Sequence, residues 1–233
     1  MPGALPIKIL ALDTATPRSS VALLEGAELM AEWRLYSPET HSARLLRSIE
    51  HMAEQAGWAL ADLNLIAAGI GPGSFTGIRI GVATALGLAQ TLALPFAPVS
   101  GLDAVAHSVR LIHGRLGVVM DAQRAQVYYA EYISEGGKIR RLVRPALYTP
   151  RDLKARIVPR GLHLVGDGVQ RYACELKSLS AGWPRLLETD LFLAPSIARL
   201  ALKRRRAWRI GPYLQAQPLY VRPPDALRAR AAK

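Results

Sequence analysis

The first third of the chain alternates between short apolar runs and polar turn residues, a pattern typical of β-strands joined by tight connections. Residues 7–12 and 19–24 are nearly continuous apolar runs, and the turn Asp13-Thr14-Ala15-Thr16-Pro17-Arg18 separates them. A third run covers residues 29–36. We therefore expect three consecutive strands, with a tight turn directly after Asp13.

The spacing of apolar residues then changes to the three-and-four pattern of helices. From His41 onward, behind the candidate N-cap Thr40, this pattern continues as far as Gly57. Four further elements are expected from periodicity and punctuation: a strand over 62–70, a helix from Phe75 to Leu92, a short strand ending at Val99 and a helix over 102–113. Beyond residue 133 the pattern is less regular, and predicts only a strand over 162–165 and a helix over 194–206.

A coarse repeat relates the two halves of the chain. An apolar strand that ends in aspartate, a short turn containing arginine and a returning strand occur at residues 7–24 and again at 116–133, with Asp13 and Asp121 in equivalent places. Internal duplication predicts two related α/β subdomains with mixed sheets and packed helices. We expect an N-terminal subdomain over 1–113, a smaller C-terminal subdomain over 114–210, and a basic, proline-rich tail over 211–233.

Composition and the N-terminal sequence indicate the compartment in which the protein acts. Half of the 233 residues are apolar, which suffices for a globular core, and Cys174 is the only cysteine, so no intrachain disulfide can form. The N-terminus lacks the pattern of a signal peptide, and the uncharged stretch over 80–102 is interrupted by two prolines. We expect a cytoplasmic protein with no membrane partner, in which this stretch is a buried helix followed by a short strand.

The formal charge of +12 is unevenly distributed along the chain. Residues 201–233 carry nine Lys or Arg against one Asp, a charge of +8, which leaves +4 for the first 200 residues. The body of the protein is therefore only mildly basic. The basic C-terminus has two interpretations: an RNA-binding arm, or a solvated helix end whose cations suit the helix dipole.

A glycine-rich stretch from Gly69 to Gly81, with five glycines in thirteen residues, connects an expected strand to an expected helix. Its spacing excludes the phosphate loop of nucleotide hydrolases, the dinucleotide fingerprint and the nucleophile elbow. We expect Ser74 to cap the helix that begins at Phe75 rather than to act as a nucleophile.

Gly77, Gly81 and Ala85 recur every four residues, so one stripe of this helix is nearly bare of side chains. Another backbone can approach such a stripe closely. The stripe has two interpretations, a contact for a partner protein or a joint with the chain's own sheet, and we favour the partner. If it faces outward, a charged substitution at Gly77 or Gly81 abolishes association and leaves the monomer folded.

The sequence contains few candidates for catalytic or metal-binding residues. The histidines lack the spacing of three or four that places two ligands on one helical face, since His41 and His51 are ten residues apart and His107 and His113 six. Asp13 has two open interpretations. It could position hydrated Mg²⁺ beside a nucleotide phosphate, or it could cap its own turn.

Several motifs resemble a known family. The Asp13-Thr14 turn and its repeat at Asp121 resemble the phosphate hairpins of the actin-like ATPase superfamily (ASKHA, RNase H-like fold), which includes sugar kinases and heat-shock chaperones. ILALDTAT (9–16), GPGSFTGIRIG (71–81), MDAQRAQVYYAEY (120–132) and PLYVRP (218–223) together are similar to the bacterial TsaB (YeaZ) family. The match covers nearly the whole chain in order, and the glycine segment is its most specific part.

The resemblance implies a duplicated actin-like fold and a non-catalytic subunit. Such a subunit dimerises and activates a TsaD-like transferase in the complex that places threonylcarbamoyl on the adenosine beside the tRNA anticodon. A TsaE-like ATPase would join through the complex, and tRNA would be contacted indirectly. The metal-binding His-x-x-x-His helix of the catalytic paralogue corresponds here to Gly101 and Val105, so that metal site is not expected.

The resemblance also implies where partners and cofactors bind. No cofactor is expected for the chain alone, ATP or ADP is the candidate ligand at the complex interface, and Asp13 and Thr14 are the vestige of a nucleotide site. The partner surface would involve the helices on either side of the glycine motif. The candidate partner-binding residues are His41, Leu45, Gly73, Phe75, Thr76, Gly77, Arg79, Ile80, Gly81 and Thr84.

An alternative function within the same superfamily is an ATP-dependent small-molecule kinase. In that interpretation Asp13 holds Mg²⁺ and Asp121 serves as the base. Against it, the second half of the chain offers no convincing glycine cluster for adenosine beyond Gly166-Asp167-Gly168.

Overall fold

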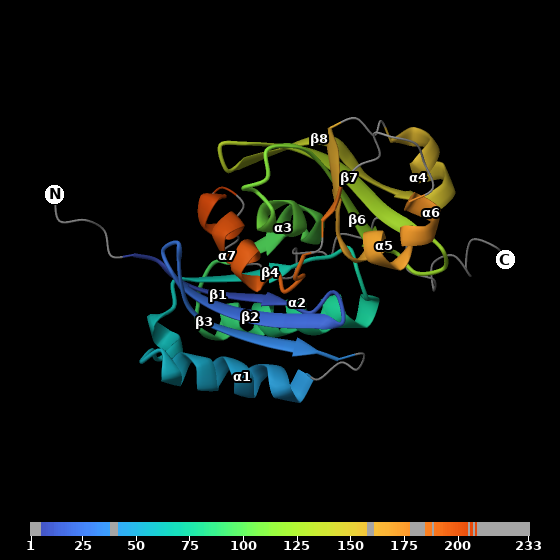
Figure 1. Ribbon diagram of the computed structural model, residues 1–233. Coiled ribbons are helices and arrows are strands. Elements are labelled where there is room, and N and C mark those ends of the chain that lie inside the picture. The colour runs from blue at the N-terminus through green and yellow to red at the C-terminus, as the bar shows by residue number, and fades with distance from the viewer. Residues whose placement is uncertain are drawn as a thin grey trace. The chain divides into compact units, whose positions relative to one another are not determined.

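The computed structural model describes residues 6–37, 42–157, 161–177, 185–187, 189–204, 206 and 208 (Figure 1). These residues divide into two compact units. The first unit contains the described residues up to Gly101 together with those from Phe192 onward, and the second contains those from Leu102 to Leu191. His41, the PLYVRP segment and the expected tail over 211–233 lie outside the described residues.

A five-stranded mixed sheet forms the centre of the first unit, in the order β3-β2-β1-β4-β5. β1 is antiparallel to β2 and parallel to β4, so the hairpin at Asp13 lies beside a parallel crossover connection. The apolar runs of the sequence become strands because both faces of this sheet are covered. The strands are β1 (Lys8–Asp13), β2 (Arg18–Glu25), β3 (Glu28–Tyr36), β4 (Leu65–Gly69) and β5 (Phe96–Val99).

Two helices, α1 (Ser42–Gln55) and α2 (Phe75–Thr91), pack on one face of this sheet. Their buried apolar residues form one core with alternate residues of β1 and β2. The core includes Leu10, Leu12, Val21 and Leu23 of the strands, Leu45, Ile49 and Met52 of α1, and Ala85 and Ala89 of α2. The outer faces of α1 and α2 therefore lie on the same side of the first unit.

The C-terminal helix α7 (Ala194–Lys203) contacts β1, β2, β4 and β5, and covers the other face of the first sheet (Figure 1). Ile197 and Ala198 are fully buried there, and the Ala194 amide donates to the Ser20 hydroxyl at 3.1 Å. The helix itself is as expected, but the expected boundaries assigned it to the second subdomain. It groups with the first unit because its apolar side completes that unit's core.

The second unit repeats the strand arrangement of the first. Its sheet has the order β10-β9-β6-β7-β8, and from β8 inward it shows the same sequence of antiparallel and parallel neighbours as the first sheet from β3 inward. This confirms the predicted duplicated, actin-like fold with mixed sheets. The strands are β6 (Gly114–Asp121), β7 (Val127–Glu135), β8 (Lys138–Tyr148), β9 (Leu162–Val165) and β10 (Arg185–Leu187).

Four helices belong to the second sheet: α3 (Gly101–Ser108), α4 (Pro150–Arg156), α5 (Asp167–Arg171) and α6 (Ala173–Lys177). α3 is tied to the sheet by the buried carboxylate of Asp103. This group accepts a hydrogen bond from the Tyr132 hydroxyl at 2.9 Å and pairs with Arg141, so β7 and β8 both hold the helix. Tyr129, Leu153, Leu164 and Leu176 are among the residues of the unit's core.

Several expected boundaries differ from the structure. The strand expected over 62–70 is a short 3-10 helix (Leu60–Asp62) followed by β4, and the helix expected over 102–113 ends at Ser108. β8 and the short helices α4 to α6 were not predicted. Register shifts interrupt the pairing of β8 with β7, and helices of five to seven residues are too short to show a 3.6-residue period.

The uncharged stretch over 80–102 proves to be the end of α2, the strand β5 and the start of α3, as its prolines indicated. None of the helices in the described ranges is long and apolar enough to cross a lipid bilayer.

Replacing Ile197 by alanine should destabilise the protein by about 2 to 5 kcal/mol, because it opens a cavity between α7 and the first sheet. Urea-induced unfolding measures the loss. Lys203→Ala, at an exposed position of the same helix, is the control and should change the stability little. Equal stabilities of the two variants would show that α7 does not contribute to this core.

Candidate functional site

The glycine-rich segment connects β4 to α2 and contains the N-cap of the helix. The Ser74 hydroxyl accepts a hydrogen bond from the Gly77 amide at 3.2 Å, which is the N-cap contact predicted from sequence. The Ser74 amide in turn donates to the Ala15 carbonyl at 2.7 Å. The start of α2 is thereby held against the turn that follows β1.

The bare stripe of α2 faces this same turn. The Thr14 hydroxyl donates to the Gly77 carbonyl at 2.7 Å. A Cβ atom at Gly77 would collide with the Thr14 carbonyl oxygen, and one at Gly81 would collide with the Thr14 hydroxyl. Ala85, the third member of the stripe, is fully buried in the core. The stripe therefore packs inside its own unit. The prediction that it contacts a partner protein is wrong.

This packing separates the candidate partner-binding residues into two groups. Leu45, Gly77 and Gly81 are buried, and a Cβ at Gly73 would meet the Ala15 backbone, so all four serve the interior of the unit. The second group lies at the surface of α2. Phe75, Thr76 and Arg79 are exposed, and Ile80 and Thr84 are partly exposed.

The exposed group begins at the first turn of α2. The Phe75 side chain is 38% exposed, and the guanidinium of Arg79 stacks on its ring at 3.7 Å from the centroid. On α1, Leu46 is 46% exposed, whereas the predicted partner-binding residue Leu45 is buried. A one-residue step along a helix rotates the side chain by about 100°, and only the packed structure decides which residue points outward.

Asp13, at the end of β1, is buried to 1% exposure. One oxygen, Oδ1, accepts a long hydrogen bond from the Ala15 amide at 3.3 Å. The other, Oδ2, has no hydrogen-bond partner within the part of the chain that the structure describes. Burial raises the pKa of Asp13 to about 7, and hydrogen bonds from the Ala15 and Thr14 amides oppose this rise only in part.

The surroundings of Asp13 do not fit a magnesium or nucleotide site. A Cβ at Gly69 would meet both the Asp13 carboxylate and the Ile197 side chain, so β4 and α7 enclose the group. Thr14, its candidate companion, already donates its hydroxyl to α2. No cluster of three or more His, Cys, Asp or Glu side chains suited to a metal ion occurs among the described residues. The donor set at this place is one carboxylate beside an apolar side chain.

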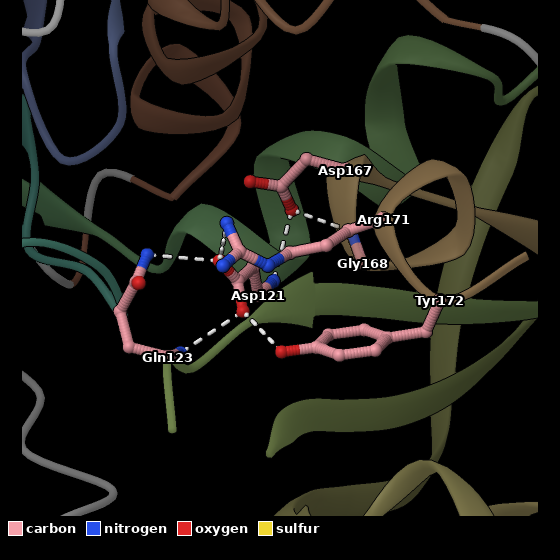
Figure 2. A network of polar contacts seen from close by, with 6 residues as sticks. All are labelled: Asp121, Gln123, Asp167, Gly168, Arg171 and Tyr172. Carbon is pink, nitrogen blue, oxygen red and sulfur yellow. Dashed lines mark hydrogen bonds and ion pairs between the residues drawn. The ribbon is translucent and has the colours of Figure 1, made fainter. Parts of the chain in front are cut away.

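Asp121 occupies the equivalent position in the second unit, and Figure 2 shows its surroundings. Its Oδ1 accepts from the Gln123 amide at 2.9 Å and from the Tyr172 hydroxyl at 3.1 Å. Its Oδ2 accepts from the Gln123 side-chain amide at 2.8 Å and pairs with Arg171 at 3.2 Å. Each oxygen therefore has two donors, and the carboxylate is fully engaged within its own unit.

Asp167, at the start of α5, completes this network. Its Oδ1 accepts from the Asp121 amide at 3.0 Å and from the Gly168 amide at 2.9 Å (Figure 2). Burial raises the pKa of Asp167, although these backbone donors lower it. In the sequence Gly166-Asp167-Gly168 stands out only as a glycine cluster, and Arg171 and Tyr172 were not predicted as site residues. No local signal connects residues 46 to 51 positions from Asp121 to it.

In both units the amide two residues after the aspartate donates to its Oδ1 oxygen. These matched hairpins and the repeated strand order define a duplicated actin-like ATPase fold. The family model described as TsaD, tRNA N6-adenosine threonylcarbamoyltransferase, matches residues 36–177, more than half of the chain.

Individual relatives narrow the class. The tRNA threonylcarbamoyladenosine biosynthesis protein TsaB of Escherichia coli (strain K12) is 34% identical over 179 residues, which are 76% of this chain and 72% of that protein. TsaB of Bacillus subtilis (strain 168) is 36% identical over 135 residues, 58% of this chain and 59% of that one. The structure of YeaZ from Pseudomonas aeruginosa superposes with a TM-score of 0.78, at 29% identity, over 92% of this chain and 99% of that one. The chain belongs to the TsaB (YeaZ) family.

Replacing Gly77 by alanine should destabilise the protein by about 1 to 3 kcal/mol, because the new methyl group meets the Thr14 backbone, which cannot move aside easily. Gly87→Ala in the same helix is the matched control. A Cβ there meets nothing within 4 Å, so this change should stabilise the protein by about 0.5 to 1 kcal/mol. Urea unfolding measures both, and stabilisation by Gly77→Ala would show that the stripe faces away from Thr14.

The raised pKa of Asp13 predicts a pH-dependent stability. In the unfolded chain the pKa of an aspartate is about 3.9, so the folded protein holds the Asp13 proton more tightly. The resulting contribution to the free energy of unfolding is fully present below pH 4. It declines as the pH rises toward 7, by up to about 4 kcal/mol in total. Asp13→Asn removes the titration. The stability of this variant relative to the wild type should therefore increase from pH 4 to pH 8.

Thermal or urea unfolding at a series of pH values measures this difference. Glu54→Gln, at an exposed position of α1, is the control and should follow the wild type at every pH. A constant difference between Asp13→Asn and the wild type over this range would contradict the assignment of a buried, protonated carboxyl.

Proposed function

We propose that this chain is a non-catalytic subunit in the biosynthesis of threonylcarbamoyladenosine in tRNA, and that it acts by binding a TsaD-like transferase. Its membership of a family whose relatives are named for this process supports the first part. The surface of α2 supports the second part and is the observation on which the proposal depends.

A helix on the surface of a soluble protein normally carries charged residues on the side away from the core. α2 has 17 residues and only one charge, Arg79, whose guanidinium stacks on Phe75. Its other exposed positions include Thr76, Ala83 and Gly87, which are small and neutral. Depletion of charge is typical of the centre of a protein interface, and small side chains let a partner approach closely.

The helix α1 extends this surface, because α1 and α2 contact each other on the same face of the sheet. The exposed Leu46 lies on α1 between Arg44 and Arg47, which are also exposed. An apolar centre with charges at its margin matches the usual anatomy of an interface. We define the α1–α2 surface as Leu46, Phe75, Thr76, Arg79, Ile80, Ala83 and Thr84. The same surface would serve self-association of the chain.

The two aspartate hairpins support a role without catalysis. A catalytic base must reach the substrate's proton, whereas both oxygens of Asp121 are occupied by donors of its own unit. Asp13 is enclosed between β4 and α7, where a Cβ at Gly69 would meet both its carboxylate and Ile197. These contacts do not favour the alternative of a small-molecule kinase. ATP or ADP, a TsaE-like ATPase and tRNA enter this proposal through the assembled complex.

Replacing Ala83 by glutamate should weaken binding of the cognate TsaD-like transferase by at least about 100-fold, because an unpaired carboxylate would be buried at the centre of the interface. Calorimetry or analytical ultracentrifugation with the purified partners measures the affinity. Ala155→Glu makes the same change at an exposed position of α4 and should leave the affinity unchanged.

Both variants should unfold at the wild-type midpoint, since both positions are exposed helical sites. Wild-type affinity of Ala83→Glu for the transferase would exclude the α1–α2 surface. Tight binding and turnover of Mg-ATP by the isolated chain would instead favour the kinase.

A further inference from the structure

The basic charge of this protein is concentrated in two segments rather than one. Residues 138–156 carry seven Lys or Arg and a single Asp, a formal charge of +6 in 19 residues. Together with the +8 of residues 201–233 this exceeds the total of +12, so the remainder of the chain is slightly acidic. The mildly basic charge expected for the first 200 residues is the sum of this basic segment and a slightly acidic remainder.

The structure places this charge on one strand and one helix that contact each other, the edge strand β8 and α4. Lys138, Arg140, Arg144 and Arg151 are exposed and make no ion pair within the described residues. We call these four residues the β8–α4 surface.

The remaining charged groups of the segment have partners that leave its surface positive. Arg141 pairs with the buried Asp103, and the guanidinium of Arg156 lies over the Tyr148 ring at 5.5 Å. Asp152, the one acidic residue, accepts from the Thr149 hydroxyl at 2.8 Å as part of the N-cap of α4. Glu135 lies opposite Lys138 at the hairpin end of β8.

Charged residues on an edge strand can have a purely protective role, because they prevent the open edge from pairing with another sheet. That role accounts for cations on β8. It does not account for Arg151, which lies on a helix, nor for the choice of arginine at three of these four positions. Arginine is the side chain best suited to phosphate groups, which it can bind through two parallel N–H donors.

We propose that the β8–α4 surface binds the phosphate backbone of RNA. The identification of that RNA as tRNA rests on the proposed function. The charge of this surface and its exposure are observed independently of that function. A membrane is the less suitable polyanion, because interfacial binding needs an apolar face beside the cations. Leu142, 42% exposed, is the one large apolar side chain exposed on β8 and α4.

The test is a titration of the full chain with a fluorescently labelled, unmodified tRNA transcript, followed by anisotropy at several salt concentrations. The triple variant Lys138→Ala/Arg140→Ala/Arg144→Ala should bind at least about tenfold more weakly near 100 mM salt. The slope of log affinity against log salt should become shallower by roughly 2 to 3. Each phosphate contact that the variant lacks reduces the number of counterions released on binding.

Two further variants locate and characterise the contact. Arg47→Ala/Lys203→Ala/Arg206→Ala removes three exposed cations from the first unit and should retain nearly wild-type affinity and slope. Arg140→Lys/Arg144→Lys keeps the charge but loses the paired N–H donors of arginine, so its affinity should lie between those of the wild type and the triple variant. Unfolding midpoints and light scattering show whether each variant remains folded and monodisperse.

The inference is overturned if the β8–α4 variant keeps the wild-type affinity and slope, or if the first-unit variant loses the binding instead. It is also overturned if the wild type binds vesicles of anionic lipid but not the transcript. Aggregation of the triple variant with unchanged RNA affinity would assign the cations to edge protection. None of these results affects transferase binding, which Ala83→Glu tests independently.

Discussion

The contact between the Thr14 turn and the glycine face of α2 is the constraint on which the first unit depends. Thr14 reaches the helix with its hydroxyl, and Gly77 and Gly81 admit its backbone and side chain, because neither carries a Cβ. This contact fixes how α2 is rotated on the sheet. The rotation in turn decides that Ala85 and Ala89 enter the core and that Thr76 and Ala83 face outward.

The rotation of α2 connects the fold to the proposed function. Because the glycine face makes the interior contact, positions such as Thr76, Ala83 and Gly87 are turned to the exposed side of α2. They nevertheless carry almost no charge, which an isolated surface helix would normally have. An interface therefore explains their composition better than solubility does. In the proposed function, the glycine motif would serve partner binding indirectly, by orienting the helix that bears the α1–α2 surface.

The two aspartate hairpins show how a duplicated element can diverge. Both keep the hydrogen bond from the amide two residues ahead. Asp121 gains a guanidinium, a hydroxyl and an amide as further donors. Asp13 lies enclosed beside Ile197, and one of its oxygens has no hydrogen-bond partner among the described residues. Burial therefore favours the protonated form of Asp13. Asp121 is instead held by donors of its own unit.

Sequence by itself determined the elements whose signals are local or periodic. The duplication, the strands around Asp13 and Asp121, the cap at Ser74 and the family resemblance were all readable from residues close together in the chain. Spacing shows that a helix face is bare, but not what lies against it. Only the tertiary structure decided that the stripe of α2 meets Thr14, that α7 completes the first unit, and that Arg171 and Tyr172 surround Asp121. These contacts join residues far apart in sequence, and their geometry follows from how the whole chain packs.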